Sequence, residues 1–257
     1  MPVSFVCKTL ETPMNISSTK GASAEKLKIL VYGESGVGKT QLATTLPEST
    51  LIVSAEAGLL GLNGSDIDVI DIAVDDNGRI IPEENRINAL KNVYRFLTSQ
   101  KARDKYSWIF IDSLTEISEN LMASLYRELP ERKDTLLRYG ENAKRLKALI
   151  KSFRDLSYYN VVFTALASVE KDEVEARRYG PLVIGKVAQS LPAFFDEVFY
   201  MEVEETPEGP QRVLHCDKDN RFIAKDRSGL LGKKCPPNLG DIAQKIKGET
   251  SNDKARV

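Results

Sequence analysis

The stretch LKILVYGESGVGKT, residues 27–40, decides the fold. Its first half, Leu27 to Tyr32, is a mostly apolar, β-rich run that predicts a buried strand. Its second half, Gly33 to Thr40, matches the pattern G-x-x-x-x-G-K-[ST] in full. The residues from Lys39 to Leu46 have helix-forming composition and stop at Pro47. A strand, a glycine-rich loop and a helix in this order predict a phosphate-binding loop (P-loop).

The residue types in this loop suit a nucleoside triphosphate, for which we expect ATP. Glycines let successive backbone N–H groups point at phosphate oxygens, and the positive end of the following helix reinforces them. Lys39 is expected to reach the terminal phosphates and take part in catalysis, and the Thr40 hydroxyl to ligate Mg²⁺. The predicted nucleotide contacts in the loop are Gly33, Glu34, Ser35, Gly36, Val37, Gly38, Lys39, Thr40 and Gln41.

A second buried strand, Trp108 to Asp112, ends in a carboxylate. A carboxylate at this place can hold Mg²⁺ through water, across from Thr40. The pair Asp112-Ser113 also precedes a predicted helix, so an alternative role is a helix N-cap. Both roles can hold together, because Ser113 can cap the helix while Asp112 faces the metal.

Hydrolysis also needs a group that orients or deprotonates the attacking water. The residue after Asp112 is Ser113 rather than an acid, so the base must come from elsewhere. Glu56 is the first candidate, because it ends the strand after the P-loop helix and would lie at the carboxyl edge of the sheet. The alternative for Glu56 is a solvated turn carboxylate, and Glu116 is the second candidate for the base.

The order of apolar runs predicts an α/β fold: a mostly parallel central sheet with helices on both faces and a C-terminal β-hairpin. We expect an N-terminal arm with a role in oligomerisation, a core, and a C-terminal extension with a loose tail; their ranges are 1–25, 26–228 and 229–257. The other predicted strands are Leu51–Ala55, Ile67–Ile72, Val161–Leu166, Val198–Val203 and Gln211–Cys216, and the predicted helices are Glu83–Lys101, Leu114–Leu129 and Glu141–Leu156.

Composition limits the possible functions. The 257 residues contain 36 Lys and Arg against 37 Asp and Glu, a net charge of −1, so nucleic-acid contact must come from a local patch. The three cysteines, Cys7, Cys216 and Cys235, lack a C-x-x-C spacing, which argues against a zinc site and suits a reducing cytoplasm. No apolar run suits a membrane span, and His215 has no His or Cys at metal-ligand spacing, so we expect it to be structural.

The P-loop, the strand ending Ser54-Ala55-Glu56-Ala57-Gly58-Leu59, and Ile109-Phe110-Ile111-Asp112-Ser113-Leu114 together resemble the RecA-like recombinase ATPases. The resemblance implies a RecA-like P-loop NTPase core with Glu56 as catalytic base and Asp112-Ser113 as the metal-binding motif. Residues 28–34 and Gly180-Pro181-Leu182-Val183-Ile184-Gly185-Lys186 are similar to phage-encoded RecA-like proteins that act as single-strand annealing recombinases. This similarity covers roughly residues 27–228 and implies the cytoplasm of a bacterial host.

The resemblance also implies two DNA-binding loops, near residues 126–140 and 168–186. Cations there can neutralise phosphates, and Tyr139 and Tyr179 can stack on bases. Acidic residues are interleaved with these cations, so a solvated mixed-charge surface is the alternative. The candidate DNA-binding residues are Arg127, Arg132, Lys133, Arg138, Lys171, Arg177, Arg178 and Lys186.

Lys225-Asp226-Arg227 resembles the lysine pair that RecA-like filaments project into the ATP of a neighbouring subunit. The resemblance therefore implies that Lys225 and Arg227 complete the site of a neighbour in a homo-oligomeric ring or filament; an ordinary surface turn is the alternative. The expected function is ATP-dependent single-stranded DNA binding with annealing or strand exchange, with a single-stranded-DNA-binding protein as a possible partner. The alternative is a nucleotide-gated loader or adaptor with little turnover; a small-molecule kinase is not favoured, because no lid or acceptor pocket can be placed.

Overall fold

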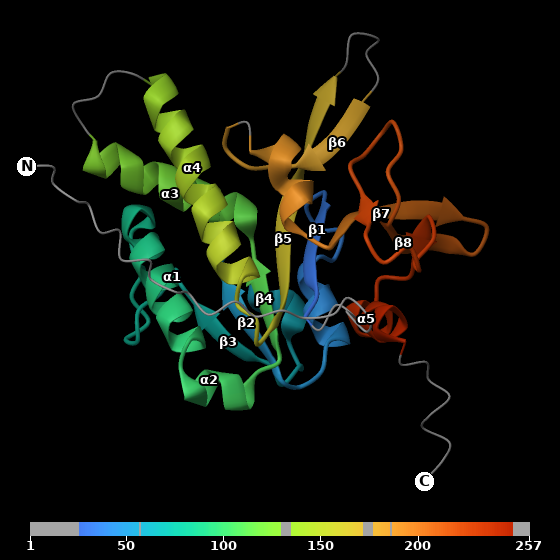
Figure 1. Ribbon diagram of the computed structural model, residues 1–257, viewed down its shortest axis with the longest axis horizontal. Helices are drawn as coiled ribbons and strands as arrows, with labels where there is room; N and C mark the ends of the chain where they lie inside the picture. Colours follow the sequence, from blue (N-terminus) through green and yellow to red (C-terminus); the bar gives the residue numbers. More distant parts are fainter. Residues whose placement is uncertain (1–25, 57, 130–134, 172–176, 186, 249–257) are drawn as a thin grey trace, which may run out of the picture.

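The computed structural model describes residues 26–56, 58–129, 135–171, 177–185 and 187–248 (Figure 1). The strands are β1 (Lys28–Gly33), β2 (Thr50–Ser54), β3 (Asp68–Asp71), β4 (Trp108–Asp112), β5 (Asn160–Lys171), β6 (Arg177–Pro181), β7 (Glu197–Thr206), β8 (Gly209–His215), β9 (Lys225–Asp226) and β10 (Lys234–Cys235). The α-helices are α1 (Glu83–Leu97), α2 (Gln100–Lys105), α3 (Leu114–Glu128), α4 (Thr135–Arg154) and α5 (Leu239–Lys247), and the 3-10 helices are η1 (Thr40–Thr45), η2 (Leu59–Leu62) and η3 (Ala188–Phe194).

The strands of the described residues join in one sheet, in the order β10-β8-β7-β1-β5-β4-β2-β3, with β6 on β5 and β9 on β7. The pairs among β7, β1, β5, β4, β2 and β3 are parallel, and the pairs that involve β6, β8, β9 or β10 are antiparallel. Strand β1 therefore lies between β7 and β5, and β5 separates it from β4. The mostly parallel sheet and the β7–β8 hairpin confirm the predicted fold class.

Both faces of the sheet are buried at its central strands: successive side chains of a strand point to opposite sides, and every residue of β1, β2 and β4 is buried. On β4, Ile109 and Ile111 belong to a core that also contains residues of α1, α3 and α4. Trp108 and Phe110 belong to a second core, which contains residues of η1 and α5. Figure 1 shows α1, α3 and α4 grouped together, away from α5. Helices on both faces are therefore confirmed.

Helix α4 begins at Thr135, earlier than the sequence predicts. Its buried stripe starts with Arg138 and Asn142 and continues with Leu146 and Ile150. The first two positions of this stripe are polar, so the apolar periodicity that predicts a helix is absent from the first turns. The predicted start of this helix at Glu141 is wrong for this reason, and the expected loop near residues 126–140 is helical from Thr135.

The helix predicted after the P-loop is a short 3-10 helix, η1. The hydroxyls of Thr44 and Thr45 donate to the carbonyls of Gln41 and Leu42, at 2.8 and 2.7 Å. Bonds of this kind to carbonyls three residues back compete with the α-helical pattern. The segment ends before Pro47, as predicted.

The segment after residue 228 is joined to the core over the part that the structure describes. Strand β10 pairs with β8, and the buried residues Leu239, Ile242 and Ala243 of α5 pack in the second core. The Leu239 N–H donates to the hydroxyl of Thr45 on η1, at 3.0 Å. Residues 245–247 belong to α5. None of the helices in the described ranges has the length and apolar character needed to cross a membrane.

Candidate nucleotide-binding site

The P-loop leaves the carboxyl end of the central strand β1 and continues into η1. Gly36 and Gly38 have φ angles of 76° and 104°, in the left-handed region that L side chains rarely adopt. A Cβ on Gly38 would also lie 3.1 Å from the Nε atom of Arg212. These glycines allow the tight wrap in which backbone N–H groups form an anion-binding concavity. The loop therefore fits a phosphate chain.

Lys39 is buried inside this loop. Its ammonium group donates to the carbonyls of Gly33 and Glu34, at 3.0 and 2.8 Å. Burial lowers the pKa of Lys39, and the carboxylates of Asp112 and Glu56 oppose this shift. Opposing carboxylates and local acceptors thus keep a buried cation beside the phosphate cradle.

Thr40 and Asp112 meet at the carboxyl edge of the sheet. The Thr40 hydroxyl donates to one carboxylate oxygen of Asp112 at 2.6 Å. The other oxygen accepts a hydrogen bond from the hydroxyl of Thr164, on the strand between β1 and β4. A hydroxyl and a carboxylate are hard oxygen donors, the type that Mg²⁺ prefers. This donor set fits the predicted role of both residues as holders of the ion.

Glu56 follows β2, the neighbour of β4 on the other side. Its carboxylate accepts a hydrogen bond from the Ser113 hydroxyl at 2.5 Å. Ser113 also caps α3, because its Oγ accepts from the N–H of Glu116. The expected helix cap by Ser113 is therefore present, whereas the metal-holding role of Asp112 stays a prediction.

Glu116, the second candidate for the base, is partly buried in the first turn of α3. Burial raises the pKa of Glu116, and the nearby carboxylates of Glu119 and Glu56 add to the effect. Glu56 and Glu116 thus lie within electrostatic range of each other, at the edge where Asp112 ends its strand.

The chain matches the AAA domain family, AAA_24, over residues 25–228. The chain belongs to this family. With the P-loop and the mostly parallel sheet, membership makes the chain a nucleotide-binding P-loop ATPase domain. Among solved structures, it is similar to a KaiC-like protein from the hyperthermophilic archaeon Pyrococcus horikoshii, with 15% sequence identity, a TM-score of 0.42, and coverage of 82% of this chain and 87% of that one. No curated protein matches the chain.

Two polar residues of this AAA domain site were missed by the sequence reasoning. Thr164 is the polar residue within the apolar run Val161–Leu166, and that exception is the signal that could have revealed it. Arg212 on β8 donates from Nε to the carbonyl of Val37 in the P-loop, at 2.8 Å. It lies 175 residues after Val37 in the sequence, so no local pattern reveals this contact.

Among the predicted DNA-binding cations whose side chains the structure describes, two are exposed and one is buried. Arg178 on β6 is exposed, and Arg127 is exposed with a hydrogen bond to Asn85. Lys171 and Arg177 are paired residues in the antiparallel register of β5 and β6. Arg132, Lys133 and Lys186 lie outside the described residues.

The prediction that Arg138 binds DNA is wrong, because its side chain is buried among the buried residues of α4. Its guanidinium donates to the carbonyl of Leu129 at 2.8 Å and lies over the ring of Tyr126. Tyr139 is 43% exposed, whereas Tyr179 stacks on Tyr200 with ring centroids 5.1 Å apart. Arg138 is thus held within the fold, and Tyr179 is partly buried.

Lys225 and Arg227 lie away from the P-loop of their own chain. Strand β9 pairs with Glu197 and Val198 at the amino end of β7, whereas the P-loop lies at the carboxyl ends of the parallel strands. The Lys225 ammonium donates to the carbonyls of Pro192 and Phe195, and Arg227 forms a 2.6 Å ion pair with Asp196. Their role in the site of a neighbouring subunit stays a prediction.

Proposed function

We propose that this AAA domain hydrolyses ATP with Mg²⁺, is stimulated by single-stranded DNA, and promotes annealing or strand exchange. The observation that supports hydrolysis is the meeting of Lys39, the Thr40–Asp112 pair and Glu56 at one edge of the sheet. Phosphate ligand, metal ligand and candidate base are the parts that a phosphoanhydride hydrolase needs.

In this proposal, separate residues bind the phosphates, hold the ion and activate the water. The P-loop backbone and Lys39 hold the phosphates, and Thr40 and Asp112 hold the ion. Mg²⁺ bound there supplies neutralisation of the charge that develops on the phosphate oxygens. Glu56 orients the water and accepts its proton, and the Ser113 hydroxyl fixes the direction of that carboxylate.

The DNA-dependent part of the proposal rests on the resemblance to annealing recombinases and on the exposed side chains of Arg127, Tyr139 and Arg178. We place single-stranded DNA along this surface. Rings or filaments follow if Lys225 and Arg227 enter the site of a neighbour. A single-stranded-DNA-binding protein is a proposed partner, and a bacterial host cytoplasm the proposed setting.

The test compares ATP hydrolysis with and without single-stranded DNA, and images the protein with DNA and a non-hydrolysable ATP analogue by electron microscopy. We expect DNA to raise the rate, and rings or filaments that need both ligands. Equal rates with and without DNA, together with no gel shift at low salt, would contradict the DNA-dependent part. ATP binding that requires Lys39 would still support the nucleotide site in that case.

A second candidate is a nucleotide-gated loader or adaptor with little turnover. It is favoured by the carboxyl end of the apolar part of β5, where Ala165, Leu166 and Ala167 offer no polar side chain to sense a γ-phosphate. The variant Glu56→Gln separates the two candidates. It leaves the function of a switch intact, whereas it traps a hydrolase in an ATP-bound, DNA-bound form.

A further inference from the structure

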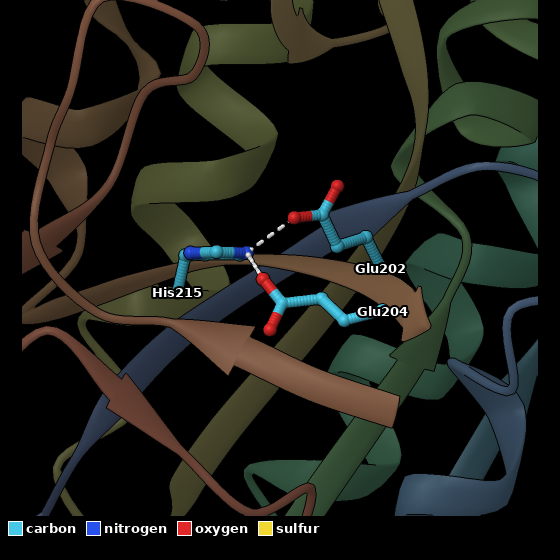
Figure 2. A group of neighbouring side chains, drawn as sticks. All are labelled: Glu202, Glu204 and His215. Atoms are coloured by element: carbon cyan, nitrogen blue, oxygen red, sulfur yellow. Dashed lines mark hydrogen bonds and ion pairs between the residues drawn. The ribbon is translucent and has the colours of Figure 1, made fainter. Parts of the chain in front are cut away.

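Three side chains of the β7–β8 hairpin converge on one point, apart from the Thr40–Asp112 pair. Figure 2 shows the imidazole of His215 directed at the carboxylates of Glu202 and Glu204. The His215 Nε2 atom lies 2.6 Å from Glu202 Oε1 and 3.4 Å from Glu204 Oε1. The three candidate ligand atoms lie within 4.8 Å of one another. The sequence predicts a structural His215 because it offers no second His or Cys, but the structure brings two carboxylates to it.

The register of the hairpin explains the convergence. Tyr200 pairs with His215, Glu202 with Val213 and Glu204 with Gln211, so both glutamates and the histidine share one face of the two strands. The imidazole lies against the rings of Tyr200 and Phe222, with centroids 5.9 and 4.3 Å away, which fixes its orientation. A ligand held in place before binding loses little freedom when an ion arrives.

The cluster is closed at the imidazole and open at the carboxylates. The side chain of His215 is 3% exposed, whereas those of Glu202 and Glu204 are 23% and 28% exposed. A cation can therefore reach the Nε2 atom from solvent by passing between the two carboxylates. Buried nitrogen at the base and accessible oxygens at the mouth give an ion both a ligand and an entry path.

Only one of the two carboxylates in the cluster is paired with a lysine or arginine among the described residues. Glu204 pairs with Lys234 through both oxygens, at 2.6 and 2.8 Å. Glu202 forms no ion pair with a lysine or arginine among the described residues. A single Nε2 proton can serve only one of two facing carboxylates fully. A doubly charged ion at the same point would serve both.

We propose that Glu202, Glu204 and His215 form a site for a divalent transition-metal ion, with Zn²⁺ as the best-suited metal. One imidazole and two carboxylates match the nitrogen and oxygen donors that Zn²⁺ accepts, and water can complete a tetrahedron. Imidazole separates this site from the all-oxygen donor set of Thr40 and Asp112, which suits Mg²⁺. The two sites therefore select different ions.

The site also has a structural connection to the P-loop. Glu202 lines a cavity of about 350 Å³ together with the P-loop residues Glu34, Ser35, Gly36 and Val37. The same hairpin carries Arg212, which holds the carbonyl of Val37. A bound ion would brace the two strands that support this side of the loop.

The test uses the full chain, stripped with EDTA and then freed of chelator. Zn²⁺ is titrated calorimetrically, and Co²⁺ is added in parallel so that its visible absorption reports the ligand set. The variants are Glu202→Gln, Glu204→Gln and His215→Gln. The matched control is Glu205→Gln, an exposed glutamate on the same strand. Circular dichroism without metal checks that each variant is folded, and Glu202→Gln keeps the test valid if His215→Gln is not.

We expect one Zn²⁺ per chain and a loss of affinity of more than about a hundredfold in the ligand variants, since even second-layer partners of a metal ligand contribute 10–100-fold. The Co²⁺ absorption should vanish with the same variants and persist in Glu205→Gln. Three results would overturn the proposal: no saturable Zn²⁺ binding, equal affinity in Glu202→Gln and the wild-type chain, or loss of binding only when Cys216 and Cys235 are changed to serine.

Discussion

The carboxyl edge of the sheet and the surface near α3, α4 and the β5–β6 hairpin both carry predictions of phosphate binding, but they hold their charges differently. At the edge, Lys39, Thr40 and Asp112 are buried or bonded to one another within a few ångströms. Of the cations predicted to bind DNA at the surface, Arg138 is buried inside the fold, whereas Arg178 is exposed. A contiguous motif thus predicts the individual residues of a site, whereas a run of mixed charges predicts only the region in which a site lies.

The first test of the comparison changes Glu56 to Gln. The amide keeps the shape but cannot accept a proton, so we expect kcat to fall by about 10²–10⁴-fold, the usual contribution of a general base. Binding of ATP should persist, because the phosphate ligands are unchanged. Steady-state hydrolysis and nucleotide binding are measured together. If Glu116→Gln causes this loss and Glu56→Gln does not, the base is on α3.

The second test removes the cation of the P-loop with Lys39→Ala. We expect ATP affinity to fall about a hundredfold, since hydrogen bonds to charged groups contribute about 1.5–3 kcal/mol each. Fluorescent ATP titration measures the effect. The control is Lys245→Ala, an exposed lysine of α5, which should bind ATP like the wild type. Equal affinity in both variants would contradict the assignment of the loop.

The third test addresses Thr164, which no motif indicates. Thr164→Val keeps the shape and loses the hydrogen bond to Asp112, so the Mg²⁺ concentration for half-maximal ATP hydrolysis should rise about tenfold, the lower end for a partner of a metal ligand. Thr164→Ser should restore the wild-type requirement. An unchanged Mg²⁺ dependence in the valine variant would show that Asp112 needs no such support.

The smallest expected effect is on the DNA surface. Arg178→Ala removes one exposed cation, so the negative slope of log affinity for single-stranded DNA against log salt should become shallower by about 0.7, the value for one phosphate contact on a single strand. Salt-dependent fluorescence anisotropy measures this slope. Arg138→Ala is the contrasting variant: its slope should match that of the wild type, and its cost should appear as a lower free energy of unfolding. If the salt slope changed in Arg138→Ala and not in Arg178→Ala, Arg138 would be the DNA contact and Arg178 would not.

The part of the fold that the sequence predicts well is the part with uniform residue patterns. Continuous apolar runs predict the central strands, and Asp112 follows from the end of such a run. The first turns of α4 could not be predicted, because their buried positions are Arg138 and Asn142. Pattern methods assume apolar cores, so a helix that buries polar groups is hidden from them.

The residues of the candidate sites also differ in how far the sequence predicts them. The P-loop is contiguous in sequence, so its residues could be named before the structure was known. The contacts of Arg212 with Val37, and of His215 with Glu202, join residues that become neighbours only when strands pair. The register of the paired strands decides which side chains meet, and a search for ligand spacing along the sequence does not take that register into account.

The position of β5 between β1 and β4 has a consequence for nucleotide selectivity. Neighbouring strands lie about 4.8 Å apart, so the strand that leads to the P-loop and the strand that ends in Asp112 are separated by about 9.6 Å. Strand β5 thus acts as a spacer whose thickness is set by backbone hydrogen bonds and not by any side chain. Substitutions can change the side chains at the carboxyl ends of these strands, but not the distance between β1 and β4. Attempts to redesign the domain for a larger or smaller anion should therefore alter the loops at its rim.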